Sequence, residues 1–165
     1  MEESTDKFPC FVADNSFIAA YLLNTLCDNE PVDCDQEIEQ LLENNGQIYV
    51  PQLFWYEIGN TLLCKALRRP EKGKKQFTKS DAMDCMYDLQ QLPIYTDPQP
   101  TSEIRQRIFN LAAEYGLSYY DAAYLELARR YTALPVLTTS GGKKAEIFTG
   151  FIDNTDIAKK LKSVL

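Results

Sequence analysis

Three acidic residues stand at places in the sequence where a charged side chain is unexpected. Asp14 directly follows the first apolar run, Glu57 lies inside an otherwise apolar helical stretch, and Asp121 stands near the start of the segment 118–131. A carboxylate in an apolar setting is costly unless it is paired, so Glu57 needs a partner or a bound cation. Carboxylates within about 4–6 Å raise one another's pKa, and a hard divalent cation relieves that repulsion. If these acids meet, they predict a divalent-cation site.

Each acid also has an interpretation that needs no ligand. Asp14 could cap the helix that follows it, because Asp is a preferred N-cap residue. Ser118 and Asp121 have the spacing of a capping box, in which two residues exchange hydrogen bonds at a helix start. Glu57 could lie on a polar edge of its helix. Spacing alone therefore leaves both a shared site and three separate structural roles open.

The composition excludes several other chemistries. The chain has 165 residues and no histidine, which removes imidazole zinc sites, Ser-His-Asp triads and Cys-His dyads. Its 17 basic and 24 acidic residues give a net charge of −7, the wrong sign for binding nucleic acid through overall charge. Any nucleic-acid role must therefore rest on a local site. The length and the 45% hydrophobic content predict a single domain over 1–165.

Cysteine usage and the lack of long apolar stretches predict a cytoplasmic location. The five cysteines are an odd number without a C-x-x-C pair, as expected of reduced thiols. The first residues are acidic and polar, unlike a secretory signal. No stretch approaches the roughly 20 apolar residues that cross a bilayer. We therefore expect a soluble protein with no membrane partner.

Short apolar runs alternate with longer helical stretches along the chain. Strands separated by ten or more helical residues pair in parallel through right-handed crossovers, so the sequence predicts a three-layer α/β/α domain with a central, mostly parallel sheet. Such sheets bind ligands at the carboxyl ends of their strands, which directs attention to Asp14, Thr139 and Ser140. Strands are expected at 8–13, 47–51, 93–96, 134–139 and 151–152, and helices at 16–26, around 38–42, and at 52–67, 81–92, 104–115, 118–131 and 157–165.

Four stretches around the acids form a recognisable set. They are VADNS (12–16), EIGNT (57–61), LSYYDAAYLELA (117–128) and LTT (137–139). In this order they resemble the PIN-domain family, which includes the VapC-like toxin ribonucleases, and the third stretch is the most specific. The resemblance implies an α/β/α fold and a ribonuclease that depends on Mg²⁺ or Mn²⁺ and cuts single-stranded or structured RNA. It also suggests a homodimer and, for the toxin of a toxin–antitoxin pair, an antitoxin protein as partner.

The resemblance assigns roles residue by residue. Asp14, Glu57 and Asp121 match the family's metal-binding acids. In this hypothesis Asp14 and Asp121 hold the ion, and Glu57 binds it through water or accepts the proton of an attacking water. Four polar residues are expected to support the acids or to orient water or phosphate, and they are Ser16, Asn60, Thr139 and Ser140.

One position departs from the family pattern. After the fourth strand the family usually has a further acid two residues beyond a threonine, where this chain has Ser140. A serine adds no charge, so three carboxylates predict one divalent ion rather than two, unless Asp153 or Asp156 folds back as a substitute. The departure supports an alternative, a PIN-fold protein with weakened or lost catalysis that serves as a binding or interaction module. An enzyme of this architecture that acts on another phosphate ester is a third hypothesis.

Basic residues dominate the segment 65–79, although the chain is acidic overall. Such a cluster can contact the sugar-phosphate backbone, and the alternative is a solvated basic loop. A phosphate loop at 141–144 is excluded, because the Walker pattern requires other residues where Leu137 and Lys144 stand. The candidates for contacting RNA are Arg68, Arg69, Lys72, Lys74 and Lys75.

Overall fold

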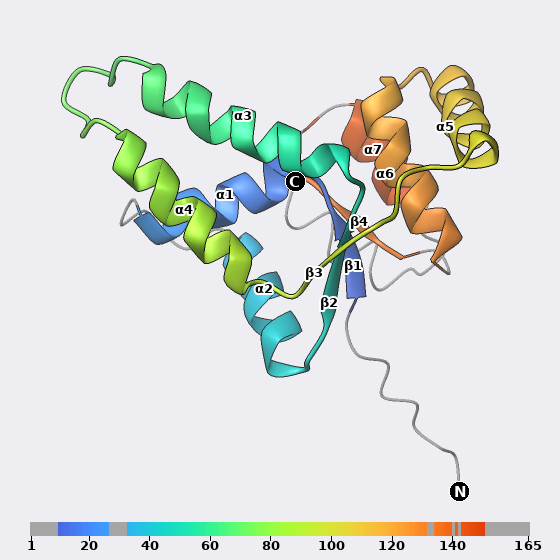
Figure 1. Ribbon diagram of the computed structural model, residues 1–165, viewed down its shortest axis with the longest axis horizontal. Coiled ribbons are helices and arrows are strands. Elements are labelled where there is room, and N and C mark those ends of the chain that lie inside the picture. The colour runs from blue at the N-terminus through green and yellow to red at the C-terminus, as the bar shows by residue number, and fades with distance from the viewer. Residues whose placement is uncertain (1–9, 27–32, 132–133, 140, 142, 151–165) are drawn as a thin grey trace, which may run out of the picture.

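The computed structural model describes residues 10–26, 33–131, 134–139, 141 and 143–150, with a parallel sheet at its centre (Figure 1). The strands of these residues are β1 (Cys10–Ala13), β2 (Gln47–Val50), β3 (Ile94–Thr96) and β4 (Val136–Leu137). They are hydrogen-bonded in the order β3-β2-β1-β4, and every neighbouring pair is parallel. The chain leaves β1 for β2 on one side and reaches β4 on the other. The strand order thus reverses at β1, and the carboxyl ends of β1 and β4 form the edge where such sheets bind ligands.

Helices cover both faces of this sheet. Their bounds are α1 (Asn15–Leu26), α2 (Asp33–Glu43), α3 (Leu53–Leu67), α4 (Lys79–Gln91), α5 (Ser102–Tyr115), α6 (Tyr119–Arg130) and α7 (Lys143–Gly150). The helices α1 to α4 lie on one side of the strands, and α5 to α7 lie on the other (Figure 1). This arrangement confirms the three-layer α/β/α fold that the alternation of strands and helices predicts.

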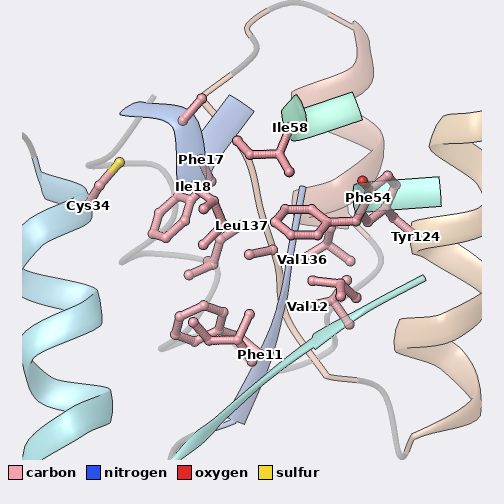
Figure 2. Packing of buried hydrophobic residues seen from close by; sticks show 14 of the residues in the cluster. Phe11, Val12, Phe17, Ile18, Cys34, Phe54, Ile58, Tyr124, Val136 and Leu137 are labelled. Atoms are coloured by element: carbon pink, nitrogen blue, oxygen red, sulfur yellow. The ribbon is translucent and has the colours of Figure 1, made fainter. Parts of the chain in front are cut away.

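Side chains from both helix layers meet the sheet in one core. Val12 of β1 is fully buried. Phe54 of α3 and Tyr124 of α6 lie near it (Figure 2), and Ile58 of α3 belongs to the same buried cluster. A strand covered on both faces needs apolar residues at successive positions, which explains why the run 11–13 is buried throughout. The same packing fixes where the carboxyl end of β1 lies.

Side-chain caps determine where two helices begin. α4 starts two residues earlier than the sequence predicts, because Thr78 and Asp81 form a capping box. The Thr78 hydroxyl accepts a hydrogen bond from the Asp81 amide at 3.1 Å, and the Asp81 carboxylate accepts one from the Thr78 amide at 2.6 Å. Ser118 caps α6, and its hydroxyl accepts from the Asp121 amide. Gly116 ends the preceding helix α5 with a positive φ of 64°.

The structure differs from the sequence prediction after β4. The helix α7 was not expected, because eight residues carry too few positions to establish a helical period. It is anchored by Phe148, which is fully buried. β4 is also shorter than the expected strand 134–139, and the strand and helix expected at 151–152 and 157–165 lie outside the described residues. In the part of the chain that the structure describes, no helix has the length and apolar character needed to span a membrane.

Candidate active site

Asp14 is the first residue after β1, and only 2% of it is exposed. Its Oδ1 accepts hydrogen bonds from the Ser16 hydroxyl at 2.7 Å and from the Phe17 amide at 3.0 Å. Its Oδ2 accepts one from the Thr138 hydroxyl at 2.6 Å. The Phe17 bond is a helix-capping bond. Asp14 therefore caps α1 and, at the same time, presents Oδ2 to the carboxyl end of β4.

Hydroxyl groups from α1 and from the end of β4 surround Asp14. The Ser16 and Thr138 hydroxyl oxygens are 3.0 Å apart, and the Thr139 amide donates to the Ser16 hydroxyl at 3.0 Å. The structure thus brings Ser16 to the expected site. Thr138, which the sequence analysis missed, supplies the buried hydroxyl, whereas Thr139 is exposed and contributes its amide. β4 ends at Leu137, so the first residue after the strand is Thr138 rather than Thr139. Ser140 lies outside the described residues.

Asp121 and Asp14 meet at the ammonium group of Lys144. The Lys144 Nζ lies 2.9 Å from Asp14 Oδ2 and 2.6 Å from Asp121 Oδ1. Asp121 stands in the first turn of α6, where its Oδ2 accepts a hydrogen bond from the Ser118 hydroxyl at 2.8 Å. Burial lowers the pKa of Lys144, but the two carboxylates raise it by more, so the net shift is upward. The amine is therefore held as a cation between two acids from different elements.

Glu57 interacts with the same charges from α3 without touching the other acids directly. The Tyr124 hydroxyl donates a short hydrogen bond to Glu57 Oε2. Burial raises the pKa of Glu57. The Tyr124 bond and the charge of Lys144 lower it by less, so the net shift is upward. Burial also raises the pKa of Tyr124, which keeps its hydroxyl protonated as a donor. The sequence gives no sign of this polar contact, because Glu57 and Tyr124 are 67 residues apart.

The polar residue expected one helical turn after Glu57 does not join the acids. Asn60 is exposed, and its side-chain oxygen accepts a weak hydrogen bond from the Cys64 thiol at 3.7 Å. Asn15 makes the contact between α1 and α3 instead, because its side-chain Nδ2 donates to the Thr61 hydroxyl at 2.9 Å. The Asn15 side-chain oxygen is buried and has no hydrogen-bond partner in the structure.

The basic residues expected to contact RNA lie far from the acids. The connection between α3 and α4 forms the tip of a helical hairpin (Figure 1), and Arg68 stands eleven residues after Glu57. At a rise of 1.5 Å per residue this separation is about 16 Å along α3. Lys74 pairs with Glu71 at 2.7 Å, and both side chains are largely exposed. The five exposed candidates at this tip are Arg68, Arg69, Lys72, Lys74 and Lys75.

Two of the three acids are placed to bind one divalent ion, whereas the three together do not form one set of ligands. Among the described residues, no three Cys, Asp or Glu side chains gather closely enough to hold a metal. Asp14 and Asp121 nevertheless converge on one position, where the Lys144 ammonium stands as a cation. Mg²⁺ is commonly bound by one or two carboxylates together with waters and substrate phosphates. This pair of acids suits such an ion, and Glu57 is held by its bond with Tyr124.

A second charged cluster lies at the other end of α6 and was missed in the sequence. Arg130 binds both oxygens of Asp97, at 3.0 and 2.6 Å, and also contacts Glu126. Arg107 reaches Glu126 from α5 at 3.1 Å. A cavity of about 520 Å³ between α5 and α6 is lined by these arginines and Glu126. Each buried acid is paired with an arginine, and the pairs join residues of α5, α6 and the end of β3. The cluster therefore holds these three elements together.

Comparison with known proteins supports the fold. The chain is similar to the solved structure of PAE2754 from Pyrobaculum aerophilum, with a TM-score of 0.59 and 21% sequence identity. The alignment covers 94% of this chain and 98% of the archaeal protein. No protein-family model matches the chain, and no curated protein matches it. The similarity therefore establishes a shared α/β/α architecture over nearly the whole chain.

Proposed function

We propose that this protein is an endoribonuclease that depends on a divalent metal ion, in accordance with its resemblance to the PIN-domain family. The observation that carries the proposal is the convergence of Asp14 and Asp121 on one cation position. This position lies at the edge of the sheet where the strand order reverses, the usual ligand site of such folds. The toxin role, an antitoxin partner, a homodimer and a cytoplasmic location are further expectations that rest on the resemblance and the composition.

The chemistry follows from the partners of each acid. Asp14 and Asp121 would hold Mg²⁺ or Mn²⁺, which when bound supplies charge stabilisation at the phosphate and a more acidic water. The buried bonds from Ser16 and Thr138 fix the orientation of Asp14. Glu57, whose pKa is raised chiefly by burial, would accept the proton of the attacking water at Oε1, because Tyr124 already binds Oε2.

Binding of RNA must rely on local positive charge, since the chain carries a net charge of −7. The exposed basic tip between α3 and α4 is the best candidate for the sugar-phosphate backbone. A strand of RNA that contacts both the tip and the acids has to run about 16 Å along α3. This geometry favours an extended substrate over a mononucleotide.

Cleavage of labelled single-stranded RNA by the metal-stripped protein, with and without added Mg²⁺ or Mn²⁺, tests the proposal. We expect cleavage that requires the ion and disappears in the double variant Asp14→Asn/Asp121→Asn, shown to be folded by circular dichroism. Asp84→Asn is a matched control, because Asp84 is an exposed acid on α4, and it should cleave like the wild type. Equal cleavage by the double variant would contradict the proposal.

The alternative is a binding or interaction module that has lost catalysis. Two observations favour it, namely the serine at position 140 in place of an acid and the ion pairs of Lys144 with Asp14 and Asp121. If this alternative is correct, the folded wild type cuts no RNA with any divalent ion tested. The Asp14→Asn variant should then still bind whatever partner the wild type binds.

A further inference from the structure

Lys144 occupies the position where the two best-placed acids could bind an ion. It stands in the first turn of α7, and its side chain is 23% exposed. The ammonium lies 5.4 Å from the centre of the Phe148 ring, one helical turn further along. Phe148 is fully buried, so the base of α7 is anchored in the core. The packing of α7 therefore directs Lys144 toward the carboxyl ends of β1 and β4.

An ammonium and a divalent ion cannot share this position. Mg²⁺ binds carboxylate oxygens at about 2.0–2.1 Å, whereas Lys144 Nζ already lies 2.9 Å from Asp14 Oδ2 and 2.6 Å from Asp121 Oδ1. An ion bound to both oxygens would stand next to the ammonium, with a charge of the same sign in a partly buried place. One cation has to leave before the other binds.

We propose that Lys144 is the positioning residue that sets the ion affinity of this site. Without the ion its ammonium keeps Asp14 and Asp121 close together, and the ion has to displace it in order to bind. The inference rests on the proposed function only in taking Asp14 and Asp121 as the ion ligands. The wild-type protein then binds divalent ions more weakly than its two carboxylates would allow, and a neutral side chain at position 144 removes the competition.

Titration calorimetry with Mn²⁺ on the full-length, metal-stripped protein tests this inference without any RNA. Lys144→Met keeps most of the side-chain length and removes the charge, and we expect it to bind Mn²⁺ at least about tenfold more tightly, equal to about 1.4 kcal/mol. Lys144→Arg keeps the charge and should bind no more tightly than the wild type. Lys79→Met, an exposed lysine on α4, is the matched control. If Lys144→Met does not fold, Lys144→Gln replaces it.

A second readout follows from linkage between ion binding and folding. Tighter binding to the folded state raises its stability further, so saturating Mn²⁺ should increase the melting temperature of Lys144→Met more than that of the wild type. If Lys144 has only a structural role, the substitution changes the melting temperature measured without Mn²⁺. It does not change the increase in melting temperature that Mn²⁺ causes.

The outcomes separate this inference from the proposed function. Tighter binding by Lys144→Met supports the inference, including the case in which the wild type binds no Mn²⁺ that can be measured. Equal affinity of Lys144→Met and the wild type, with binding lost in Asp14→Asn, overturns the inference and leaves the ion site intact. Absence of binding in both proteins overturns the inference together with the metal-dependent function.

Discussion

Asp14 combines two roles that its sequence context presents as alternatives. One carboxylate oxygen caps α1 through the Phe17 amide, and the other faces Thr138 and Lys144. A cap holds the carboxylate in one orientation, so the structural role prepares the chemical one. The helix cap inferred from the position of Asp14 and the ion site inferred from its neighbouring acids are therefore compatible.

Tyr124 connects the core to the site, which makes its hydroxyl a sensitive target. Tyr124→Phe removes the hydroxyl that donates to Glu57 Oε2. We expect the free energy of unfolding, measured by urea denaturation, to fall by about 1–2 kcal/mol, because the half-buried Glu57 carboxylate loses a hydrogen-bond donor. Tyr120→Phe, on the exposed side of α6, should change stability little. Equal effects of the two substitutions would contradict this role of Tyr124.

At the scale of elements, the α6 region shows what a sequence can predict and what it cannot. The Ser118 cap and the position of Asp121 are local, three residues apart, and both follow from spacing. The bond between Tyr124 and Glu57 and the pairing of Lys144 with Asp14 join residues far apart in the chain. Those contacts depend on how α3, α6 and α7 pack, which no local pattern contains.

The pairing of α6 with the end of β3 predicts a large loss of stability on substitution of Arg130. In Arg130→Met, Asp97, whose side chain is 8% exposed, would lose its bidentate guanidinium partner. Glu126, whose side chain is 4% exposed, would keep only Arg107. Breaking a buried pair from one side costs about 3–5 kcal/mol, and we expect a loss of that order in the free energy of unfolding. Arg105→Met, an exposed change on α5, is the control. A loss below about 1 kcal/mol, the range of surface pairs, would show that the cluster does not hold these elements together.

The start of α4 should respond to pH through Asp81. The hydrogen bonds from the Thr78 amide and hydroxyl lower the pKa of Asp81 below its ordinary value of 3.8. The unfolded state then binds more protons than the folded state between the two pKa values, so stability rises with pH there. The contribution is present above the unfolded pKa and is lost as the pH falls through the folded one. We expect Asp81→Asn to lower the melting temperature at pH 7, with a difference from the wild type that shrinks toward pH 3; a constant difference would contradict the assignment.

At the scale of the whole molecule, the arrangement of layers could be predicted because short apolar runs recur along the chain between longer helical stretches. Parallel strands covered on both faces need unbroken apolar runs, and the run 11–13 shows this pattern. The short helix α7 and the early end of β4 could not be predicted, since two to eight residues carry too little periodicity. The role of Lys144 was missed for that reason, although the segment 141–144 was considered and excluded as a phosphate loop.

The charge distribution of the whole molecule leads to a test of RNA binding. A chain with a net charge of −7 should bind RNA only where positive charge is local. The test replaces residues 68, 69, 72 and 75 by Gln in the inactive Asp14→Asn/Asp121→Asn background. Each phosphate contact contributes about 0.7 to the slope of log affinity against log salt concentration, so we expect the loss of four contacts to reduce the slope by about 3. Fluorescence anisotropy with labelled RNA measures the slope. An unchanged slope would identify the tip as a solvated loop.

The most direct test of the account is whether Asp14 and Asp121 bind one divalent ion together. Titration calorimetry of the metal-stripped protein with Mn²⁺ should detect one ion per chain, and the binding should be lost in Asp14→Asn and in Asp121→Asn but retained in Asp84→Asn. If both site variants bind Mn²⁺ with the affinity of the wild type, the two acids are not its ligands, and the metal-dependent account of this protein is wrong.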